Sequence, residues 1–283
     1  MLLATACMEY LEDRAGKVRP NTLDGYRSSA TGHVIPDLGN MKLEDITPGV
    51  IQRWLLSFPT RGVAVRSYST LRQVIRWAIR HYDIRMWDPT TVSYEMPKSK
   101  RYVPAVLGRE DTLRLIEGIR GQEWELTVAL GVLCGLRRCE ACGLMWQDMD
   151  LSTGWIRIAR GRHDIHGEVV DMPPKTEMSA RLVIVPGFYL PRVRELAGTE
   201  GYLCELSPAV IARKYKTFCL EHGLPYVPMK NLRHTWATQA LERGVSIEEI
   251  MMYLGHTNID TSYEHYLRRT DTLVERISAK FEQ

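Results

Sequence analysis

Cationic and hydroxyl side chains recur in four short segments of the second half of the chain, and they are of the types that hold and attack a phosphate group. A planar guanidinium, such as that of Arg137 or Arg233, donates to two phosphate oxygens at once. The non-bridging oxygens gain negative charge in the pentavalent transition state. A hydrogen-bond donor that is already in position before the reaction stabilises this charge, and its removal typically raises the barrier by about 3–4 kcal/mol. The other candidates for this chemistry are Lys175, Lys230, His256 and Tyr266.

Considered one at a time, these residues also have ordinary structural explanations. Arg137 could cap a helix, Lys175 could be an exposed turn residue, and Tyr266 could complete a core. Other chemistries have less support, because the sequence shows no Gly-rich nucleotide loop, no His-Glu-x-x-His segment and no obvious Asp/Glu cluster of a metal-dependent nuclease. Cys139 and Cys142 lie in an apolar, helix-like run, so we predict core thiols and expect neither a metal nor another cofactor.

The composition is that of an ordinary globular protein, with 283 residues, 45% hydrophobic and 25% charged, and a formal net charge of +3. The length predicts one large or two modest domains. No signal peptide and no apolar run of membrane-spanning length is visible, and six cysteines fit a reducing compartment, so we expect a cytoplasmic protein. The first 103 residues carry 15 Lys and Arg against 10 Asp and Glu, which permits a polyanionic partner there.

The front part of the chain, residues 1–88, is predicted to be an all-helical domain. Asn21 and Thr47 are good helix caps, and Pro48 suits a first helical position. Pro36 to Asn40 form a turn cluster. We expect helices over residues 4–14, 22–33, 47–57 and 65–82.

The last of these helices has two faces. Leu71, Val74 and Ile75 fall on one arc at 100° per residue, together with further apolar residues. The opposite arc carries Arg66, Arg72, Arg76 and Arg80, which we call the arginine stripe. The stripe is either the solvated face of an ordinary helix or a row of contacts to DNA phosphates, and Trp77 beside it is a rim residue or a sugar contact.

Residues 89–106 contain three prolines and few aliphatic side chains, and we predict an extended interdomain linker followed by a second domain over 107–283. The order there is helices, then three β-branched runs, then helices, and this segregated order, without a βαβ alternation, predicts an α+β fold with a small antiparallel sheet of three strands. The expected strands are 155–159, 168–172 and 181–185, and the expected helices are 108–119, 124–134, 207–221, 231–243, 247–254 and 270–281.

Together and in this order, the four segments resemble the tyrosine recombinase, or phage integrase, family over essentially the whole chain. Residues 135–148 match the pattern Gly-Leu-Arg-x-x-Glu-x-x-x-Leu-x-Trp-x-Asp, and Leu254-Gly255-His256 is followed ten residues later by Tyr266. The resemblance implies a helical core-DNA-binding domain followed by a catalytic domain. It further implies a site-specific recombinase that cuts and rejoins DNA through a covalent 3′-phosphotyrosine, without metal or ATP.

The resemblance also implies roles for single residues. Arg137 and Arg233 match the arginines that clamp the scissile phosphate, and Glu140 matches a supporting acid. Lys175 matches the hairpin lysine that protonates the leaving oxygen, and His256 matches a histidine that also hydrogen-bonds the phosphate. Tyr266 matches the nucleophile, and Tyr263 is the alternative candidate for that role. Lys230 stands where the family usually has His, and lysine is the poorer proton acceptor at neutral pH. The general base for the tyrosine is therefore left open.

Two further activities remain possible from the sequence: a type IB topoisomerase-like reaction, and a non-catalytic DNA-binding protein of the same fold. The family resemblance implies double-stranded attachment sites and a homo-tetramer on DNA, at work on the nucleoid of a bacterial cell. It also implies a C-terminal helix exchanged between protomers. Leu273, Val274, Ile277 and Phe281 fall on one face of such a helix, which could equally dock on its own core. Because the core-binding pattern begins almost at Met1, we expect no arm-binding domain unless one was trimmed.

Overall fold

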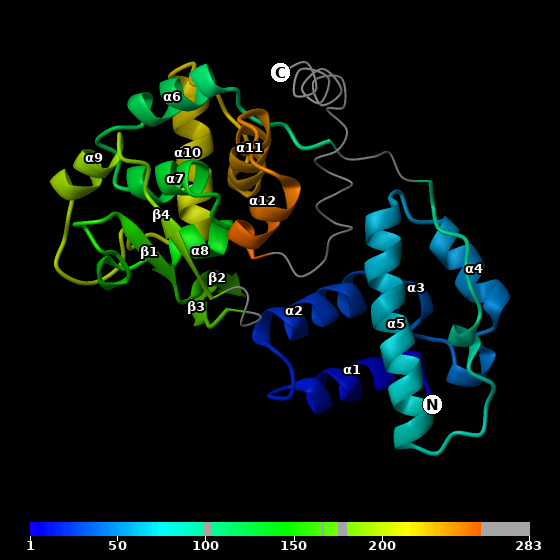
Figure 1. Cartoon of the computed structure of the whole chain (residues 1–283). Helices are drawn as coiled ribbons and strands as arrows, with labels where there is room; N and C mark the ends of the chain where they lie inside the picture. The colour runs from blue at the N-terminus through cyan, green and yellow to red at the C-terminus, as the bar shows by residue number, and fades with distance from the viewer. Residues whose placement is uncertain (99–102, 166, 175–179, 256–283) are drawn as a thin grey trace. The chain divides into compact units, whose positions relative to one another are not determined.

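The computed structural model describes residues 1–98, 103–165, 167–174 and 180–255. The chain forms two compact units, Met1–Tyr102 and Val103–Gln283, each with its own hydrophobic core (Figure 1). The first unit is helical and the second combines helices with short antiparallel strands, so the predicted α+β fold with an all-helical front part is confirmed.

The first unit is organised around one long helix. Its elements are α1 (Leu3–Arg14), α2 (Pro20–Ser29), a π-helix (Ala30–Val34), α3 (Ile35–Leu38), a 3₁₀ turn (Leu43–Asp45), α4 (Pro48–Leu56), α5 (Arg61–His81) and a second 3₁₀ turn (Pro89–Thr91). Thr60 begins α5, because its side-chain oxygen accepts a hydrogen bond from the Val63 N–H at 3.4 Å. Leu71, Val74 and Ile75 of the apolar arc are fully buried, and each such side chain contributes about 1.5–3 kcal/mol on burial.

Trp77 belongs to this core and is not a rim residue. Its side chain is 6% exposed, stacks on the His81 ring at 4.7 Å and meets the edge of Tyr10 on α1 at 5.9 Å. The indole is therefore an internal contact between α1 and α5 and is not available to a sugar.

The chain stays helical through the first part of the turn cluster that we expected at Pro36 to Asn40, and a π-helix precedes this proline. Pro36 has no N–H to donate, and its ring would clash with the carbonyl four residues earlier in a regular α-helix. The chain widens at this place: the N–H of Ile35 bonds to the Ala30 carbonyl, five residues back. The predicted helix over 22–33 thus continues to Leu38 as α3.

Much of the segment expected as linker packs on one unit or the other. In the first unit, Gln52 exchanges two 3.0 Å hydrogen bonds with the backbone of Glu95, and Tyr94 packs edge-on against Tyr68. In the second unit, the Ala105 carbonyl accepts a hydrogen bond from the Asn231 side-chain amide at 3.0 Å. The two described ends of this segment therefore pack against the units that they adjoin, and they are not an extended spacer.

The second unit has eight helical elements and four strands in its described residues. The helical elements are α6 (Arg109–Gly118), α7 (Glu125–Leu133), α8 (Arg138–Cys142), a 3₁₀ turn (Trp146–Asp148), α9 (Leu190–Glu195), α10 (Pro208–Glu221), α11 (Met229–Glu242) and α12 (Ile247–Leu254). The core includes Trp124, Leu130 and Tyr215, and it is tied to α9 by a bidentate ion pair from Arg192 to the buried Glu125.

The strands form two antiparallel pairs and not one three-stranded sheet. β1 (Trp155–Ile158) pairs with β4 (Arg181–Ile184), and β2 (Gly161–Ile165) pairs with β3 (Glu168–Met172). The sequence prediction missed β2, because none of the three expected strands covers Gly161–Ile165. Its residues are mostly polar and half-buried, so β2 lacks the apolar alternation by which a strand is recognised.

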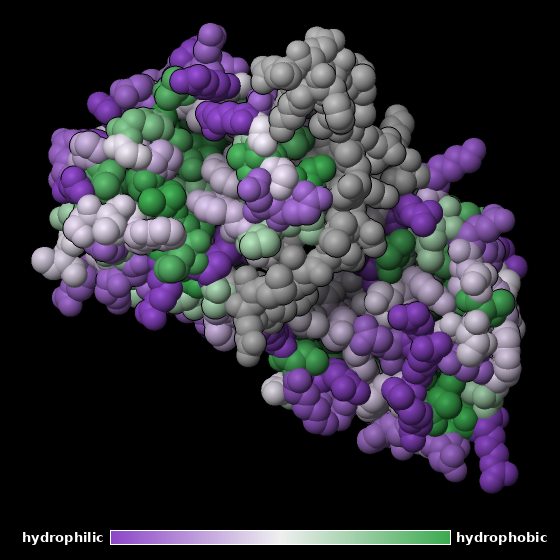
Figure 2. Space-filling model, in the orientation of Figure 1, coloured by the Kyte–Doolittle hydropathy of each residue, from purple (hydrophilic) through white to green (hydrophobic). Residues whose placement is uncertain are grey.

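The thiols are in the interior, as expected for core cysteines. Cys134 and Cys142 are buried and Cys139 is half-buried, and burial raises the pKa of Cys134 to about 12. On the face drawn in Figure 2, hydrophilic side chains cover most of the described surface and apolar ones form smaller patches. Within the described ranges, no helix has the length and apolar character needed to cross a membrane.

Candidate active site

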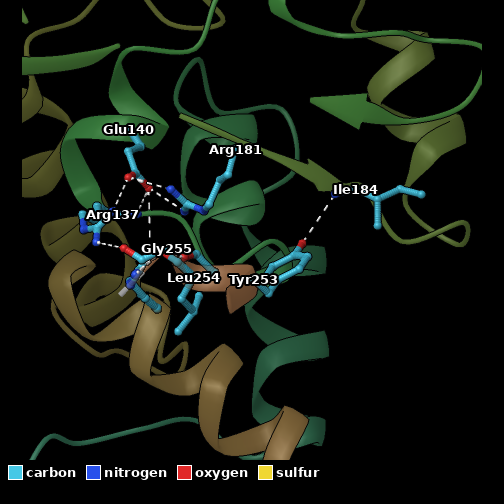
Figure 3. Close-up of polar contacts among 9 residues, drawn as sticks. Arg137, Glu140, Arg181, Ile184, Tyr253, Leu254 and Gly255 are labelled. Atoms are coloured by element: carbon cyan, nitrogen blue, oxygen red, sulfur yellow. Dashed lines mark hydrogen bonds and ion pairs between the residues drawn. The ribbon is translucent and has the colours of Figure 1, made fainter. Parts of the chain in front are cut away.

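A buried carboxylate, Glu140 on α8, lies among three arginines of the second unit (Figure 3). Arg137 donates to it twice, from the backbone N–H to Oε2 at 2.8 Å and from Nη1 to Oε1 at 2.7 Å. Arg181 on β4 donates from both terminal nitrogens, at 3.0 and 2.9 Å, and Arg233 Nη1 lies 3.9 Å away. The fold thus brings three guanidiniums to one acid.

These arginines keep Glu140 ionised. Burial by itself would raise the pKa of this carboxyl, but the hydrogen bonds and charge of Arg181, with the charges of Arg137 and Arg233, lower it to about 2. A carboxylate that is charged at every physiological pH is a permanent anchor for the guanidiniums, and this supports the structural role expected for Glu140.

Arg233 is held in place by backbone carbonyls. It lies on α11, its side chain is 9% exposed, and it donates to the carbonyl oxygens of Gly135 at 3.1 Å and Leu254 at 2.6 Å. Gly135 has a φ of 65°, and a Cβ there would come within 2.8 Å of the Leu254 side chain. Only glycine allows this close approach between the motif before α8 and the end of α12.

The end of α12 is the second anchor of the site. Ser246 caps the start of the helix, accepting from the Glu249 N–H at 3.1 Å, and Gly255 ends it in the left-handed region with a φ of 65°. The Gly255 carbonyl accepts from Arg137 Nη2 at 3.2 Å. Both arginines of the predicted clamp therefore bind carbonyls of the two residues that directly precede His256.

The remaining predicted residues divide into two groups. Lys230 is exposed at the start of α11, one helical turn before Arg233, as the sequence spacing requires. Lys175, His256 and Tyr266 lie outside the described residues, as does the rival Tyr263. The structure brings Arg137 and Arg233 together, and the catalytic roles of all these residues stay predictions.

Sequence reasoning missed Arg181, although a signal was present. In a strand, side chains two apart face the same side, so Arg181 shares the inward face with Val183 and Val185. A charged residue at an inward position needs a buried partner of opposite charge, and here that partner is Glu140.

The last residue of the 135–148 motif, Asp148, has a structural role. It is buried, accepts a hydrogen bond from the Met145 N–H at 3.0 Å and forms an ion pair with Arg160.

The arginine stripe of the first unit is a candidate surface for phosphates, and its members differ. Arg66, Arg72 and Arg80 are exposed on α5. Arg76 is half-buried, and its Nε lies 3.2 Å from Asp88 and 3.0 Å from the Thr90 hydroxyl. Asp88 therefore offsets part of the positive charge that the sequence pattern suggested.

Comparison with known proteins gives matches in both units. The "Phage integrase, N-terminal SAM-like domain" profile matches residues 3–57, and the "Phage integrase family" profile matches residues 205–272. A tyrosine recombinase XerC-like protein of Caldanaerobacter subterraneus subsp. tengcongensis is 27% identical over 58% of this chain, which spans about half (51%) of that relative. A putative prophage phiRv2 integrase of Mycobacterium tuberculosis is 23% identical over 93% of this chain and 74% of its own length.

Solved structures share the fold. The Tn1549 transposon integrase in complex with a circular intermediate DNA superposes with a TM-score of 0.79 at 16% identity, over 98% of this chain and 99% of that one. A lambda integrase tetramer bound to a Holliday junction gives a TM-score of 0.67 at 20% identity, over 94% and 77%. The profiles matched in both units are thus those of the phage integrase family, relatives with detectable identity are named tyrosine recombinases and integrases, and the solved integrase structures share the fold of this chain.

Proposed function

We propose that this chain is a site-specific DNA recombinase that cuts and rejoins strands through a covalent 3′-phosphotyrosine at Tyr266. The observation that supports it most is the meeting of Arg137 and Arg233 at the end of α12, directly before His256. Two guanidiniums held by Glu140 and by backbone carbonyls are oriented before substrate arrives, which is what stabilisation of a developing charge requires.

The chemistry conserves the energy of the broken bond. The Tyr266 oxygen attacks the scissile phosphorus and passes its proton to the general base, whose identity the sequence leaves open. The bond from phosphorus to the 5′ oxygen breaks at the same time, and that oxygen takes a proton from Lys175. Arg137, Arg233 and His256 bind the non-bridging oxygens as their charge grows. A 5′ hydroxyl of a partner strand then attacks the phosphotyrosine and releases the phenol. Strands are thus rejoined without ATP.

A nicked suicide substrate tests this function. When the short fragment that carries the 5′ hydroxyl diffuses away, rejoining fails and the protein stays attached to DNA. We expect a covalent complex with the unmodified chain, none with Tyr266→Phe, and normal trapping with Tyr263→Phe as the matched control. Addition of a chelator should leave trapping unchanged. Trapping by Tyr266→Phe would refute the nucleophile, and no trapping by the unmodified chain on its own attachment site would refute the recombinase.

We also propose the partners of the reaction. Exchange between two duplexes needs four active sites, and the lambda integrase neighbour is a tetramer bound to a Holliday junction. We expect four copies of this chain on a synthetic junction, with the C-terminal segment of each docked on its neighbour. The relatives include prophage and transposon integrases, which favours integration or excision of a mobile element on the bacterial nucleoid. Light scattering of the junction complex measures the copy number, and deletion of residues 270–283 should lower it.

A further inference from the structure

β4 begins with an arginine that no motif identified and that reaches into the candidate active site. The Arg181 side chain is only 7% exposed, and its two terminal nitrogens bind the two oxygens of Glu140 separately (Figure 3). This forked contact fixes both the position and the rotation of the carboxylate, because neither oxygen can move without lengthening a hydrogen bond.

The charge balance shows why such a fixed carboxylate matters. Three guanidiniums gather around one buried acid, and like charges repel strongly in a site of low dielectric constant. Arg137 Nη1 lies 2.7 Å from Oε1, the oxygen that also accepts from Arg181 Nη1. The orientation of Arg137 therefore depends on a carboxylate whose orientation depends on Arg181.

The strand that carries Arg181 is itself held at two places. Arg181 pairs with Ile158 at the end of β1, and the N–H of Ile184 donates to the Tyr253 hydroxyl of α12 at 3.4 Å. Tyr253 in turn stacks on Trp236 of α11 at 4.4 Å. β4 thus connects the acid of α8 to the two helices that supply Arg233 and the Leu254 and Gly255 carbonyls.

We propose that Arg181 is a positioning residue for strand cleavage: by holding Glu140 it fixes the guanidinium of Arg137 in the orientation that receives the scissile phosphate, without touching DNA itself. This inference rests on the proposed recombinase function. Arg181→Met removes the charge and the forked donors but keeps a side chain of similar length. Arg181→Lys keeps the positive charge but places it on one ammonium nitrogen, which cannot reproduce the fork. Arg157→Met on β1 is the matched control, because Arg157 is exposed and sits on the neighbouring strand.

The first test is single-turnover cleavage at saturating DNA. We expect Arg181→Met to slow cleavage by about 10- to 100-fold, the range known for residues that orient active groups. Arg181→Lys should lie between it and the unmodified chain, and DNA affinity should change no more than in Arg157→Met. Thermal unfolding checks that each variant is folded. If Arg181→Met does not fold, the cleavage rate of Arg181→Lys still tests the proposal. Cleavage by both variants at the unmodified rate overturns the proposal.

The second test separates the phosphate clamp from the leaving group. A substrate with sulfur in place of the bridging 5′ oxygen has a leaving group that needs no proton. We expect the defect of Arg181→Met to persist on this substrate, because the clamp on the non-bridging oxygens is what has been lost. Recovery of the rate would show that Arg181 acts on the proton donor instead, and would overturn the proposal.

A third readout needs no activity. The Nε–Hε resonance of Arg137 in a nitrogen-15 spectrum of the full chain should shift in Arg181→Met and stay in place in Arg157→Met. An unmoved resonance refutes the positioning role by itself. An unmodified chain that never forms a covalent complex refutes the recombinase function instead, so the two ideas fail separately.

Discussion

Arg233 Nη2 donates to the carbonyl oxygen of Leu254 at 2.6 Å, and this contact joins the middle of α11 to the last residue of α12. Together with the bond from Arg137 to Gly255, it makes the end of a helix part of the arginine site. The two arginines predicted to bind phosphate are consequently connected by hydrogen bonds to the residues that directly precede His256.

Removal of the central carboxylate should destabilise the chain. Glu140→Gln leaves three buried or half-buried guanidiniums without their shared counter-charge, and breaking a buried ion pair in this way costs about 3–5 kcal/mol. Urea unfolding of the full chain measures the loss. Glu168→Gln, at an exposed position of β3, is the control and should change stability little. An equal effect of the two substitutions would contradict the anchor role.

The same carboxylate predicts how stability depends on acid pH. Its pKa is about 2 in the folded chain and about 4.3 in an unfolded one, so its stabilising effect is fully present above the unfolded value. The effect is lost as the pH falls from there towards 2. The difference in unfolding free energy between the unmodified chain and Glu140→Gln should therefore shrink below about pH 4.5. A difference that stays constant down to pH 3 would be inconsistent with this pKa.

Displacement of the Gly255 carbonyl should lower the cleavage rate more than it lowers the stability of the fold. Gly255→Ala adds about 1–2 kcal/mol of backbone strain at a φ of 65° and moves the acceptor of Arg137. We expect cleavage to fall about 10- to 100-fold, since small displacements of reacting groups are costly. Gly223→Ala is matched in strain, with a φ of 60° and nothing within 4 Å of the added Cβ, and should cleave normally.

The arginine stripe can be tested by the salt dependence of DNA affinity. Replacement of Arg66, Arg72 or Arg80 by Ala should each lower the slope of log affinity against log salt by about 0.9 if that residue contacts a phosphate. Arg76→Ala should have a smaller effect because Asp88 already offsets its charge. Asp88→Asn should strengthen binding for the same reason. Slopes unchanged in the three exposed variants would mean that the stripe is only solvated.

Lys230 occupies the position where the family usually has histidine, and its exchange tests the proton path. Lys230→His should keep or raise cleavage and introduce a pH dependence near about 6.5, the ordinary range of imidazole. Lys230→Ala is the reference for loss of the side chain. If the histidine variant loses as much activity as the alanine variant, the site requires a lysine at the start of α11.

The elements that the sequence predicted well are those with local signals. Thr47 caps α4 through its own side chain, as predicted, and the apolar arc of α5 is long enough to define its period. The cap at Thr60 was not predicted, and α5 begins at Arg61, four residues before the expected start. The π-helix before Pro36 was not predicted, because the sequence shows where a helix cannot continue regularly but not whether the chain bends or widens there.

The site was predictable to the extent that its residues lie in motifs. Arg137 and Arg233 are 96 positions apart, and only their shared resemblance to one family suggested that they meet. Arg181 lies in no motif, and its burial depends on the pairing of β1 with β4, which is a contact between distant parts of the chain. The Leu254 and Gly255 carbonyls escaped prediction altogether, since backbone acceptors leave no mark in a sequence.

The acceptors at the end of α12 lie 21 and 118 positions after the arginines that they hold. A polypeptide still emerging from the ribosome therefore cannot align its two guanidiniums until residue 255 has been added and folded. Copies that stop before this point would lack both carbonyl acceptors, so the arrangement of the two arginines described above requires synthesis of the chain through residue 255.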